Sequence, residues 1–360
     1  MPRTIGLISG TSLDGVDAAW LETDGQVVTE FGPSLTVAYD DKLRADLRRL
    51  LDRAPALRAD DAALRDAAGR LTAYHIQAVR ALDRPADLIG FHGQTILHRP
   101  ASRRTWQVGD AARLARETGI PVAYDFRSAD IAAGGEGAPF APVYHAALAS
   151  GLTRPLAVLN IGGVANVTWI GPDGALLAFD TGPGNGPLDD WVSRHTGAPF
   201  DRDGALAMSG WADAAVLARL MAHRYFARPA PKSLDRLDFS HALADSGLDG
   251  LSPSNGAATL VAFIASSVAA GVFPAQPTRW LIGGGGRHNP AIVAALRDRL
   301  GVTVEPVEAE GWDGDALEAQ CFGFLAARVA SGLPLSFPGT TGVAAPMPGG
   351  AIVDPMGHRA

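Results

Sequence analysis

The sequence predicts an α/β protein of two domains, each built on a mixed β-sheet flanked by helices. Its 360 residues are enough for two domains of roughly 150 residues each. Two separate segments open with closely spaced short apolar runs joined by glycine-rich turns, which indicates strands in hairpins. After each opening, helical patterns alternate with single short strands, which is typical of α/β units.

Composition narrows the class of protein. The chain is 47% hydrophobic and 19% charged, which supplies two cores and excludes disorder over most of its length. Its net charge is −7 and its cationic residues are scattered, so a nucleic-acid surface is not predicted. Cys321 is the sole cysteine, which excludes an internal disulfide and a cysteine-based zinc site. Without a signal-peptide core or a run of about 18 apolar residues, we expect a soluble cytoplasmic protein.

The first half opens with three predicted strands. The apolar run 4–9 indicates a buried strand and ends in a turn of small and polar residues at 10–15. Strands at 16–22 and 26–31 follow, and Asp24-Gly25 between them favours an antiparallel hairpin. Dinucleotide-binding folds open as β-α-β instead. The elements predicted next are helices at 40–53 and 60–83, a strand at 87–92, and strands at 105–108 and 121–124 flanking a helix at 110–118.

The second half repeats this topology. A strand at 156–161 ends in Gly162-Gly163, and strands at 164–170 and 175–179 follow. The elements predicted next are helices at 187–195 and 256–273, a strand at 279–283, a helix at 289–300, a strand at 302–305 and a helix at 314–331. A Gly-, Ala- and Pro-rich stretch at 131–143 separates the halves. We therefore place the domains at 1–131 and 132–360.

Glycines and small residues gather where predicted strands end. The three clusters are Gly10-Thr11-Ser12-Leu13-Asp14-Gly15, then Gly162-Gly163 with Gly182-Pro183-Gly184-Asn185, and finally Gly283-Gly284-Gly285-Gly286 before Pro290. Backbone N–H groups in such turns, or at a helix start, can bind phosphate. The alternative at each cluster is a turn that needs glycine for its shape. A four-glycine loop costs much conformational entropy, which favours a binding role for the last cluster.

Polar side chains also follow predicted strands. His92 is the last residue of the strand at 87–92 and Gln94 follows it, at the kind of strand end where α/β sheets bind ligands. Arg127 follows the strand at 121–124 and could bind a carboxylate or phosphate through two hydrogen bonds. Asp180 ends the strand at 175–179 and could act as a general base. The alternatives are a hydrogen-bonded loop histidine at His92 and a domain-interface salt bridge at Arg127.

Several common catalytic motifs do not occur. The sequence has neither G-x-x-x-x-G-K-[ST] nor G-x-G-x-x-G, so two familiar phosphate-binding loops are excluded. It also lacks G-x-S-x-G and H-E-x-x-H, which argues against a serine hydrolase and a dedicated zinc site.

Ten strings in fixed order resemble the anhydro-N-acetylmuramic acid kinase family from end to end. They are ISGTSLDGVD (8–17), FHGQTILHRP (91–100), WQVGD (106–110), GIPVAYDFRSAD (119–130), GGEGAP (134–139), LNIGGVANVT (159–168), FDTGPGN (179–185), DGALAMSG (203–210), GGGGRHNP (283–290) and GDALEAQCF (314–322). Each string alone is weak, but their joint order and spacing are specific. One departure is Pro187, which could alter the start of the following helix.

The resemblance implies the fold shared by actin, hexokinase and Hsp70-type proteins, with ATP in the cleft between the domains. The family's reaction also implies Mg²⁺, as phosphoryl transfer usually requires, although its ligands stay unassigned. The residues implied to bind the nucleotide are Gly10, Thr11, Ser12, Leu13, Asp14, Gly15, Val16, Asp17, Gly162, Gly163, Gly182, Gly184, Asn185, Gly283, Gly284 and Gly285.

The resemblance also implies a reaction. ATP, water and 1,6-anhydro-N-acetylmuramic acid would give N-acetylmuramic acid 6-phosphate and ADP in peptidoglycan recycling, in the bacterial cytoplasm. Asp180 would activate the water that attacks C1, while O6 takes the γ-phosphoryl group. His92, Gln94 and Arg127 lie in matching strings and are candidates for the substrate side, with Arg127 facing the lactyl carboxylate. A homodimer is also expected from the resemblance, whereas nucleic-acid and membrane partners are not.

Two alternatives to this reaction stay open. A kinase of the same fold could act on another sugar, and only the pocket around 91–130 would distinguish it. An ATP-binding regulator or chaperone-like ATPase could have lost the sugar chemistry. The intact Asp180 favours an enzyme, because a protein without catalysis has no need of a carboxylate there.

Overall fold

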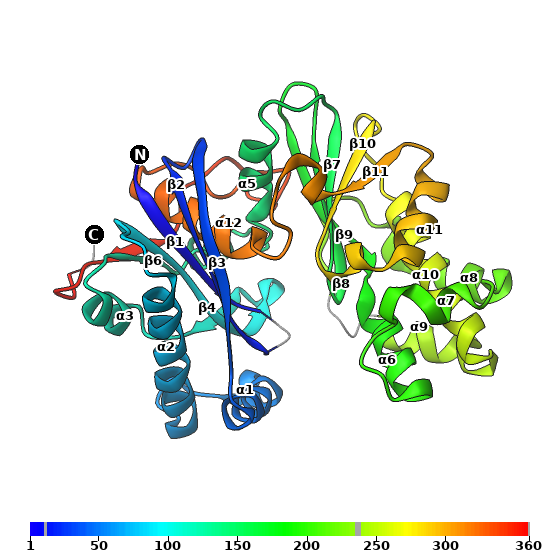
Figure 1. The fold of residues 1–360 in the computed structure, drawn as a ribbon, viewed down its shortest axis with the longest axis horizontal. Helices are drawn as coiled ribbons and strands as arrows, with labels where there is room; N and C mark the ends of the chain where they lie inside the picture. Colours follow the sequence, from blue (N-terminus) through cyan, green and yellow to red (C-terminus); the bar gives the residue numbers. More distant parts are fainter. Residues whose placement is uncertain (11–12, 235–238, 359–360) are drawn as a thin grey trace. The chain divides into compact units, whose positions relative to one another are not determined.

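The computed structural model describes residues 1–10, 13–234 and 239–358 (Figure 1). The chain forms two compact units: unit 1 is Met1–Gly151 with Ala316–Ala360, and unit 2 is Leu152–Asp315. This division differs from the boundary predicted at 131/132. Helix α5 (Ala141–Leu148) packs on α12 (Leu317–Ala330), and α12 packs on the sheet of unit 1. Because of these contacts, the C-terminal segment belongs to unit 1.

The sheet of unit 1 has the strand order β12-β6-β4-β1-β2-β3, and β5 pairs with β4. Strands β1, β2 and β3 are antiparallel neighbours, as predicted, whereas β4 runs parallel to β1 and β6 parallel to β4. Strand β4 runs past the predicted strand at 87–92 because its second half forms a hairpin with β5. The bounds are β1 (Arg3–Ser9), β2 (Gly15–Thr23), β3 (Val28–Ala38), β4 (Leu88–Arg99), β5 (Arg104–Val108), β6 (Val122–Tyr124) and β12 (Ala351–Val353).

The sheet of unit 2 repeats this arrangement. Its order is β11-β10-β7-β8-β9, with antiparallel pairing among β7, β8 and β9 and parallel pairing of β10 with both β7 and β11. The strand order β9-β8-β7-β10-β11 therefore corresponds to β3-β2-β1-β4-β6 of unit 1, both in the order in which the strands occur along the chain and in whether neighbours run parallel or antiparallel. The bounds are β7 (Leu156–Ile161), β8 (Val164–Ile170), β9 (Leu176–Pro183), β10 (Arg279–Gly283) and β11 (Thr303–Pro306). The predicted fold class of two mixed sheets with duplicated topology is confirmed.

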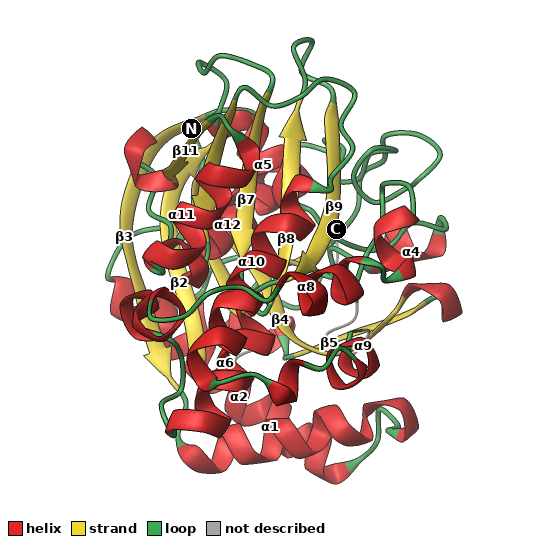
Figure 2. Ribbon diagram, turned by 90° about the vertical axis from the view of Figure 1, so that its right-hand side faces the viewer, coloured by secondary structure: helices red, strands yellow, loops and turns green. Residues whose placement is uncertain are grey.

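Helices flank the strands of both units (Figure 2). The long predicted helices are confirmed with small shifts at their ends; Asp40 and Asp61 cap α1 and α2 by accepting backbone N–H groups. Short helices such as α4, α5 and α8 were not predicted. The remaining bounds are α1 (Asp41–Arg53), α2 (Ala62–Leu82), α3 (Ala111–Thr118), α4 (Ser128–Ala132), α6 (Asn185–Thr196), α7 (Ala205–Met208), α8 (Ala214–Met221), α9 (Ser240–Asp245), α10 (Pro253–Ala269) and α11 (Pro290–Leu300). Within the described residues, no helix combines the length and apolar character needed to cross a membrane.

Two glycines let α12 lie directly on the sheet of unit 1. A Cβ atom on Gly6 of β1 would lie 1.7 Å from the carbonyl oxygen of Ala319. A Cβ atom on Gly90 of β4 would lie 1.9 Å from the carbonyl oxygen of Phe322. Both distances are far inside van der Waals contact with backbone atoms, so any side chain would force the helix away.

The change Gly90→Ala is therefore expected to lower the free energy of unfolding by about 3 kcal/mol, as overpacking of a tight core does. Denaturant titration followed by circular dichroism measures this loss. Gly151→Ala is the matched control, because a Cβ atom there meets no atom within 4 Å. Equal unfolding midpoints for the two variants would show that α12 does not need this close approach.

Candidate functional site

The residues predicted to form the site fall into two groups. The turn at 10–17, His92, Gln94 and Arg127 belong to unit 1, whereas Asp180 and the later glycine clusters belong to unit 2. Thr11 and Ser12 lie outside the described residues. The geometry of each group is given within its own unit.

Tyr39 holds both sides of the turn between β1 and β2. Its hydroxyl donates to Ser9 Oγ at 2.6 Å, where β1 ends, and its backbone N–H donates to the carbonyl oxygen of Asp14 at 2.9 Å. Leu13 between them is buried and has a positive φ of 57°. The side chain of Asp14 is exposed, and the half-buried Asp17 accepts a hydrogen bond from Thr36. Tyr39 therefore fixes Ser9 and Asp14, on either side of residues 11–12, and Asp14 lies at the surface.

Gln94 fixes the end of β1 from the other side. It is 1% exposed, and its Oε1 accepts a hydrogen bond from Ser9 Oγ. Its Nε2 donates to the carbonyl oxygen of Thr95 at 3.2 Å. Ser9 and Gln94 are also register partners in the parallel pair β1–β4. This side chain stabilises the sheet beside the turn, so its predicted contact with a substrate finds no support in its surroundings.

His92 and Arg127 are joined by a hydrogen bond in which Arg127 is the donor. Arg127 Nε lies 3.1 Å from His92 Nε2, and His92 Nδ1 lies 2.9 Å from the carbonyl oxygen of Gly93. A guanidinium can only donate, so Nε2 must accept and Nδ1 must carry the proton. Burial, together with the Arg127 charge, holds the pKa of His92 well below its usual range. The imidazole is therefore neutral and orients Arg127.

Arg127 stays a cation despite its surroundings. Burial lowers its pKa to about 10, while the carboxylates of Glu318 and Asp130 act in the opposite direction. Within the described part of the chain, His92 is the only hydrogen-bond partner of its guanidinium. The two Nη groups are therefore free to bind an anion.

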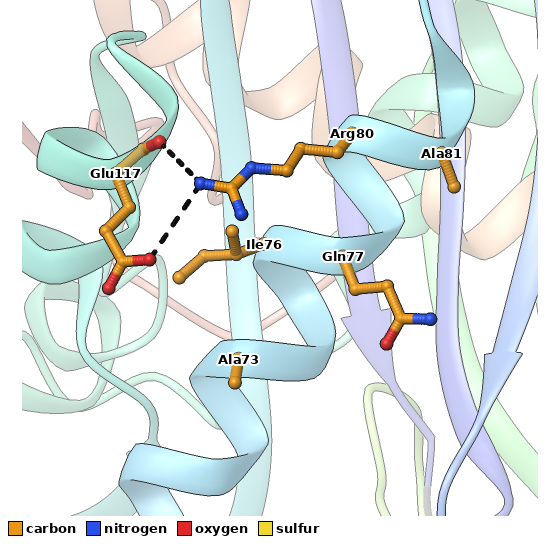
Figure 3. A pocket seen from close by; sticks show the side chains of 6 residues that line it. All are labelled: Ala73, Ile76, Gln77, Arg80, Ala81 and Glu117. Carbon is orange, nitrogen blue, oxygen red and sulfur yellow. Dashed lines mark hydrogen bonds and ion pairs between the residues drawn. The ribbon is translucent and has the colours of Figure 1, made fainter.

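A cavity of about 640 Å³ lies beside His92, where β4, β5 and β6 meet α3. Its wall includes Trp106, Gln107, Asp110, Tyr124 and Asp125. A second pocket, of about 410 Å³, lies over α2 and the end of α3 and contains none of the predicted site residues (Figure 3). Its lining residues are Ala73, Ile76, Gln77, Arg80, Ala81 and Glu117. Arg80 of α2 donates a hydrogen bond to the carbonyl oxygen of Glu117 and forms an ion pair with its carboxylate. These contacts join α2 to α3, so we assign this pocket a structural role.

Asp180 lies inside β9, one residue beyond the predicted strand end. Asn166 of β8 faces Asp180 whereas Ala165 faces Gly182, so Thr181 is the extra residue of a β-bulge. Bulges re-aim side chains and are frequent beside active sites. The half-buried carboxylate accepts a hydrogen bond from Leu234 N–H at 2.7 Å. Burial raises the pKa of Asp180 to about 7, although the Leu234 bond acts to lower it.

The glycine clusters of unit 2 lie against one another. A Cβ atom on Gly184 would lie 2.2 Å from the carbonyl oxygen of Gly162, and one on Gly284 would lie 2.7 Å from the carbonyl oxygen of Ile161. Backbone contact of this kind requires glycine. Gly163 and Gly285 are exposed within this cluster, whereas Gly182 packs against Ser267 of α10 and Gly283 is buried.

Two groups of backbone N–H donors that the sequence suggested for phosphate binding form hydrogen bonds within the protein instead. The N–H groups of Gly184, Asn185 and Gly186 donate to the carbonyl oxygens of Gly162 and Gly163. The prediction that α11 begins with free N–H groups is wrong. Asn289 caps that helix by accepting from Ala291 and Ile292.

Arg287 secures the loop that carries Gly284. It donates to the carbonyl oxygen of Gly284 at 3.0 Å and forms ion pairs with Glu308 and Asp315, both at 2.8 Å. Its side chain is 4% exposed. Arg287 is not among the predicted site residues, and the only sequence feature that could have indicated its role is its position in the string GGGGRHNP.

Comparison with known proteins agrees with the resemblance. The sequence model of the family described as anhydro-N-acetylmuramic acid kinase matches residues 2–355. A protein of that name from Acidiphilium cryptum is 63% identical over 353 residues, 98% of each chain. Those from Rhodospirillum rubrum and Gluconobacter oxydans are 56% and 55% identical, over 96% and 98% of this chain and 92% and 100% of theirs. The prediction of an enzyme of this kinase class is confirmed, and the chain belongs to the anhydro-N-acetylmuramic acid kinase family.

Proposed function

We propose that this chain hydrates and phosphorylates 1,6-anhydro-N-acetylmuramic acid in one reaction, giving N-acetylmuramic acid 6-phosphate and ADP. Family membership supports the kinase activity. The observation that carries the hydrolytic step is Asp180, a carboxylate at a β-bulge with a pKa near 7. A base with that pKa combines a large ionised fraction at neutral pH with useful proton affinity.

The substrate's own structure dictates the order of bonds. Its O6 is bonded to C1, so no free 6-hydroxyl exists to accept a phosphoryl group. Water attacks C1, Asp180 takes the proton of that water, and the C1–O6 electron pair moves to O6. O6 then bonds to the γ-phosphorus as the bond to ADP breaks. Holding O6 beside the phosphorus makes the transfer nearly intramolecular, which can be worth roughly 7–11 kcal/mol.

The nucleotide contacts are assigned to the turn of unit 1 and the exposed glycines of unit 2. The backbone at 10–17 would face the phosphates, and Gly163 and Gly285 allow close approach of the nucleotide. No group of three or more metal-ligating side chains occurs within the described residues. Mg²⁺ is commonly held by one or two carboxylates together with phosphate oxygens, so Asp14 and Asp17 fit this role. When bound, the ion would neutralise phosphate charge during transfer.

The sugar is assigned to Arg127 and His92. The Nη groups of Arg127 suit a carboxylate, which the lactyl substituent supplies. Neutral His92 holds the guanidinium in place through Nε2. Gln94 then contributes through Ser9 and the end of β1 rather than by touching the sugar.

The pH dependence of the reaction tests the base. A carboxyl group with a raised pKa loses its ionised form as pH falls through that pKa, so kcat/KM is expected to fall tenfold per pH unit below about 7. Direct quantification of the sugar phosphate by mass spectrometry, from pH 5 to 9, measures this profile. A kcat/KM that stays nearly constant from pH 7 down to pH 5, as expected for an aspartate with the ordinary pKa of about 4, would remove Asp180 as the base.

An activity assay separates this function from its alternatives. Purified protein with Mg·ATP and the anhydro sugar is expected to yield ADP and sugar 6-phosphate in equal amounts. Phosphorylation of ordinary hexoses instead would indicate a kinase for another sugar. ATP binding without any phosphorylated sugar would indicate a regulator.

We also propose the biological setting that the family implies. The reaction serves peptidoglycan recycling in the bacterial cytoplasm, and the working form is a homodimer. Multi-angle light scattering is expected to give twice the chain mass of 37.4 kDa. A mass of one chain over the working concentration range would contradict the dimer.

A further inference from the structure

We propose that Tyr225 is a positioning residue for the general base. Its hydroxyl holds the Asp180 backbone at the β-bulge and so maintains the hydrogen bond that the Asp180 carboxylate accepts from Leu234 N–H. The inference deepens the proposed function and rests on the assignment of Asp180 as the base. It concerns the segment 225–234, which contains no residue of the predicted site.

This one segment binds Asp180 at three atoms. Tyr225 Oη donates to the carbonyl oxygen of Asp180 at 2.5 Å, and Asp180 N–H donates to the carbonyl oxygen of Lys232 at 2.9 Å. Leu234 N–H donates to Oδ2 at 2.7 Å. Because β9 is the edge strand of its sheet, no further strand makes these bonds. Within the described residues, the segment takes the place of a neighbouring strand at Asp180.

Tyr225 is itself held firmly. It is 2% exposed, and its ring makes edge contacts with Phe226 and Phe239 at centroid distances of 5.9 Å. Lys232 Nζ lies 4.6 Å from the ring centroid and donates to the Tyr225 carbonyl oxygen at 3.2 Å. A buried hydroxyl needs a hydrogen-bond partner, and the Asp180 carbonyl supplies it. The hydroxyl therefore has a fixed position from which to hold the bulge.

The groups around Asp180 explain how the hydrogen bond from Tyr225 affects the protonation of the Asp180 carboxyl group. The cations of the segment are Lys232 and Arg228, which lie over the Tyr225 ring. Asn166 of β8, which faces Asp180, and Ser267 of α10, which packs on Gly182, carry no charge. The Leu234 hydrogen bond favours the ionised carboxylate and opposes burial. A bulge freed from Tyr225 would weaken that bond, so the protonated acid would persist to higher pH.

The test is Tyr225→Phe, which keeps the ring and removes the hydroxyl. We expect kcat to fall about tenfold, with KM for both substrates within about twofold. The acid limb of kcat/KM is expected to move upward by about half to one pH unit. The matched control is Tyr144→Phe, another buried tyrosine, whose hydroxyl donates to Gln320 Oε1 at 2.9 Å in unit 1. Its acid limb is expected to stay in place.

A second measurement does not depend on turnover. Carboxyl ¹³C NMR of the aspartate-labelled protein follows the titration of Asp180, with Asp180→Asn identifying the resonance. An upward shift of that titration in Tyr225→Phe, but not in Tyr144→Phe, supports the positioning role even if the sugar assignment fails. An unchanged acid limb and an unchanged titration in folded Tyr225→Phe would overturn it.

Discussion

Replacing Asp180 with asparagine is expected to lower kcat about 10³-fold while ATP affinity stays within about twofold. Asparagine keeps the size of the side chain and can still accept the Leu234 N–H bond at Oδ1. It cannot take a proton from water, so the attack on C1 loses its base. Steady-state kinetics measures the first quantity, and isothermal titration with a non-hydrolysable ATP analogue measures the second.

A matched variant shows whether this loss is specific. Asp189 in α6 is another half-buried carboxyl of unit 2, and burial with its acidic neighbours raises its pKa to about 6. Asp189→Asn makes the same chemical change away from the bulge, and its kcat is expected to stay close to that of the unmodified protein. If Asp180→Asn keeps its turnover within tenfold, the base assignment is wrong.

Replacing Arg127 with alanine is expected to raise KM for the anhydro sugar about 100-fold, with KM for ATP changed by less than about threefold. Hydrogen bonds between charged partners contribute about 1.5–3 kcal/mol, and the variant loses them together with the Nε–H group that donates to His92 Nε2. Arg127→Lys is expected to restore only part of the affinity, because an ammonium group cannot bind a carboxylate in bidentate fashion. Initial rates with each substrate varied in turn measure both constants.

The control for Arg127 is Arg104→Ala, which removes an exposed arginine at the start of β5. Its two KM values are expected to match those of the unmodified protein. If Arg127→Ala leaves KM for the sugar unchanged, the carboxylate of the substrate lies elsewhere, and the cavity beside His92 becomes the first place to examine.

Much of the fold could be predicted because its signals are local. Short apolar runs separated by turns gave both hairpin openings, and helical spacing gave α1, α2 and α10. The return of α12 to unit 1 could not be predicted in this way. It depends on close contact between that helix and Gly6 and Gly90, which lie more than 200 residues earlier in the chain. A glycine within a strand does not reveal which segment approaches it.

The site shows the same division between local and distant signals. Asp180 and the glycine clusters stand in recognisable strings at the ends of predicted strands, so they could be proposed from the sequence, whereas their contacts within unit 2 depend on a strand order that the structure supplies. Tyr225 acts on a residue 45 positions away, and Tyr39 on one 30 positions away, with no pattern to connect them. The cap on α11 could have been found, because asparagine directly before proline at a helix start is a common capping arrangement.

The most direct test of the coupled reaction is to run it in ¹⁸O-labelled water and locate the label in the product by mass spectrometry. The account predicts one ¹⁸O at C1 of the sugar 6-phosphate and none in the phosphate group. The product must be read promptly, with N-acetylmuramic acid 6-phosphate in the same water as the correction for anomeric exchange. Label in the phosphate group, or a C1 position no richer in ¹⁸O than that correction, would contradict attack of water on C1.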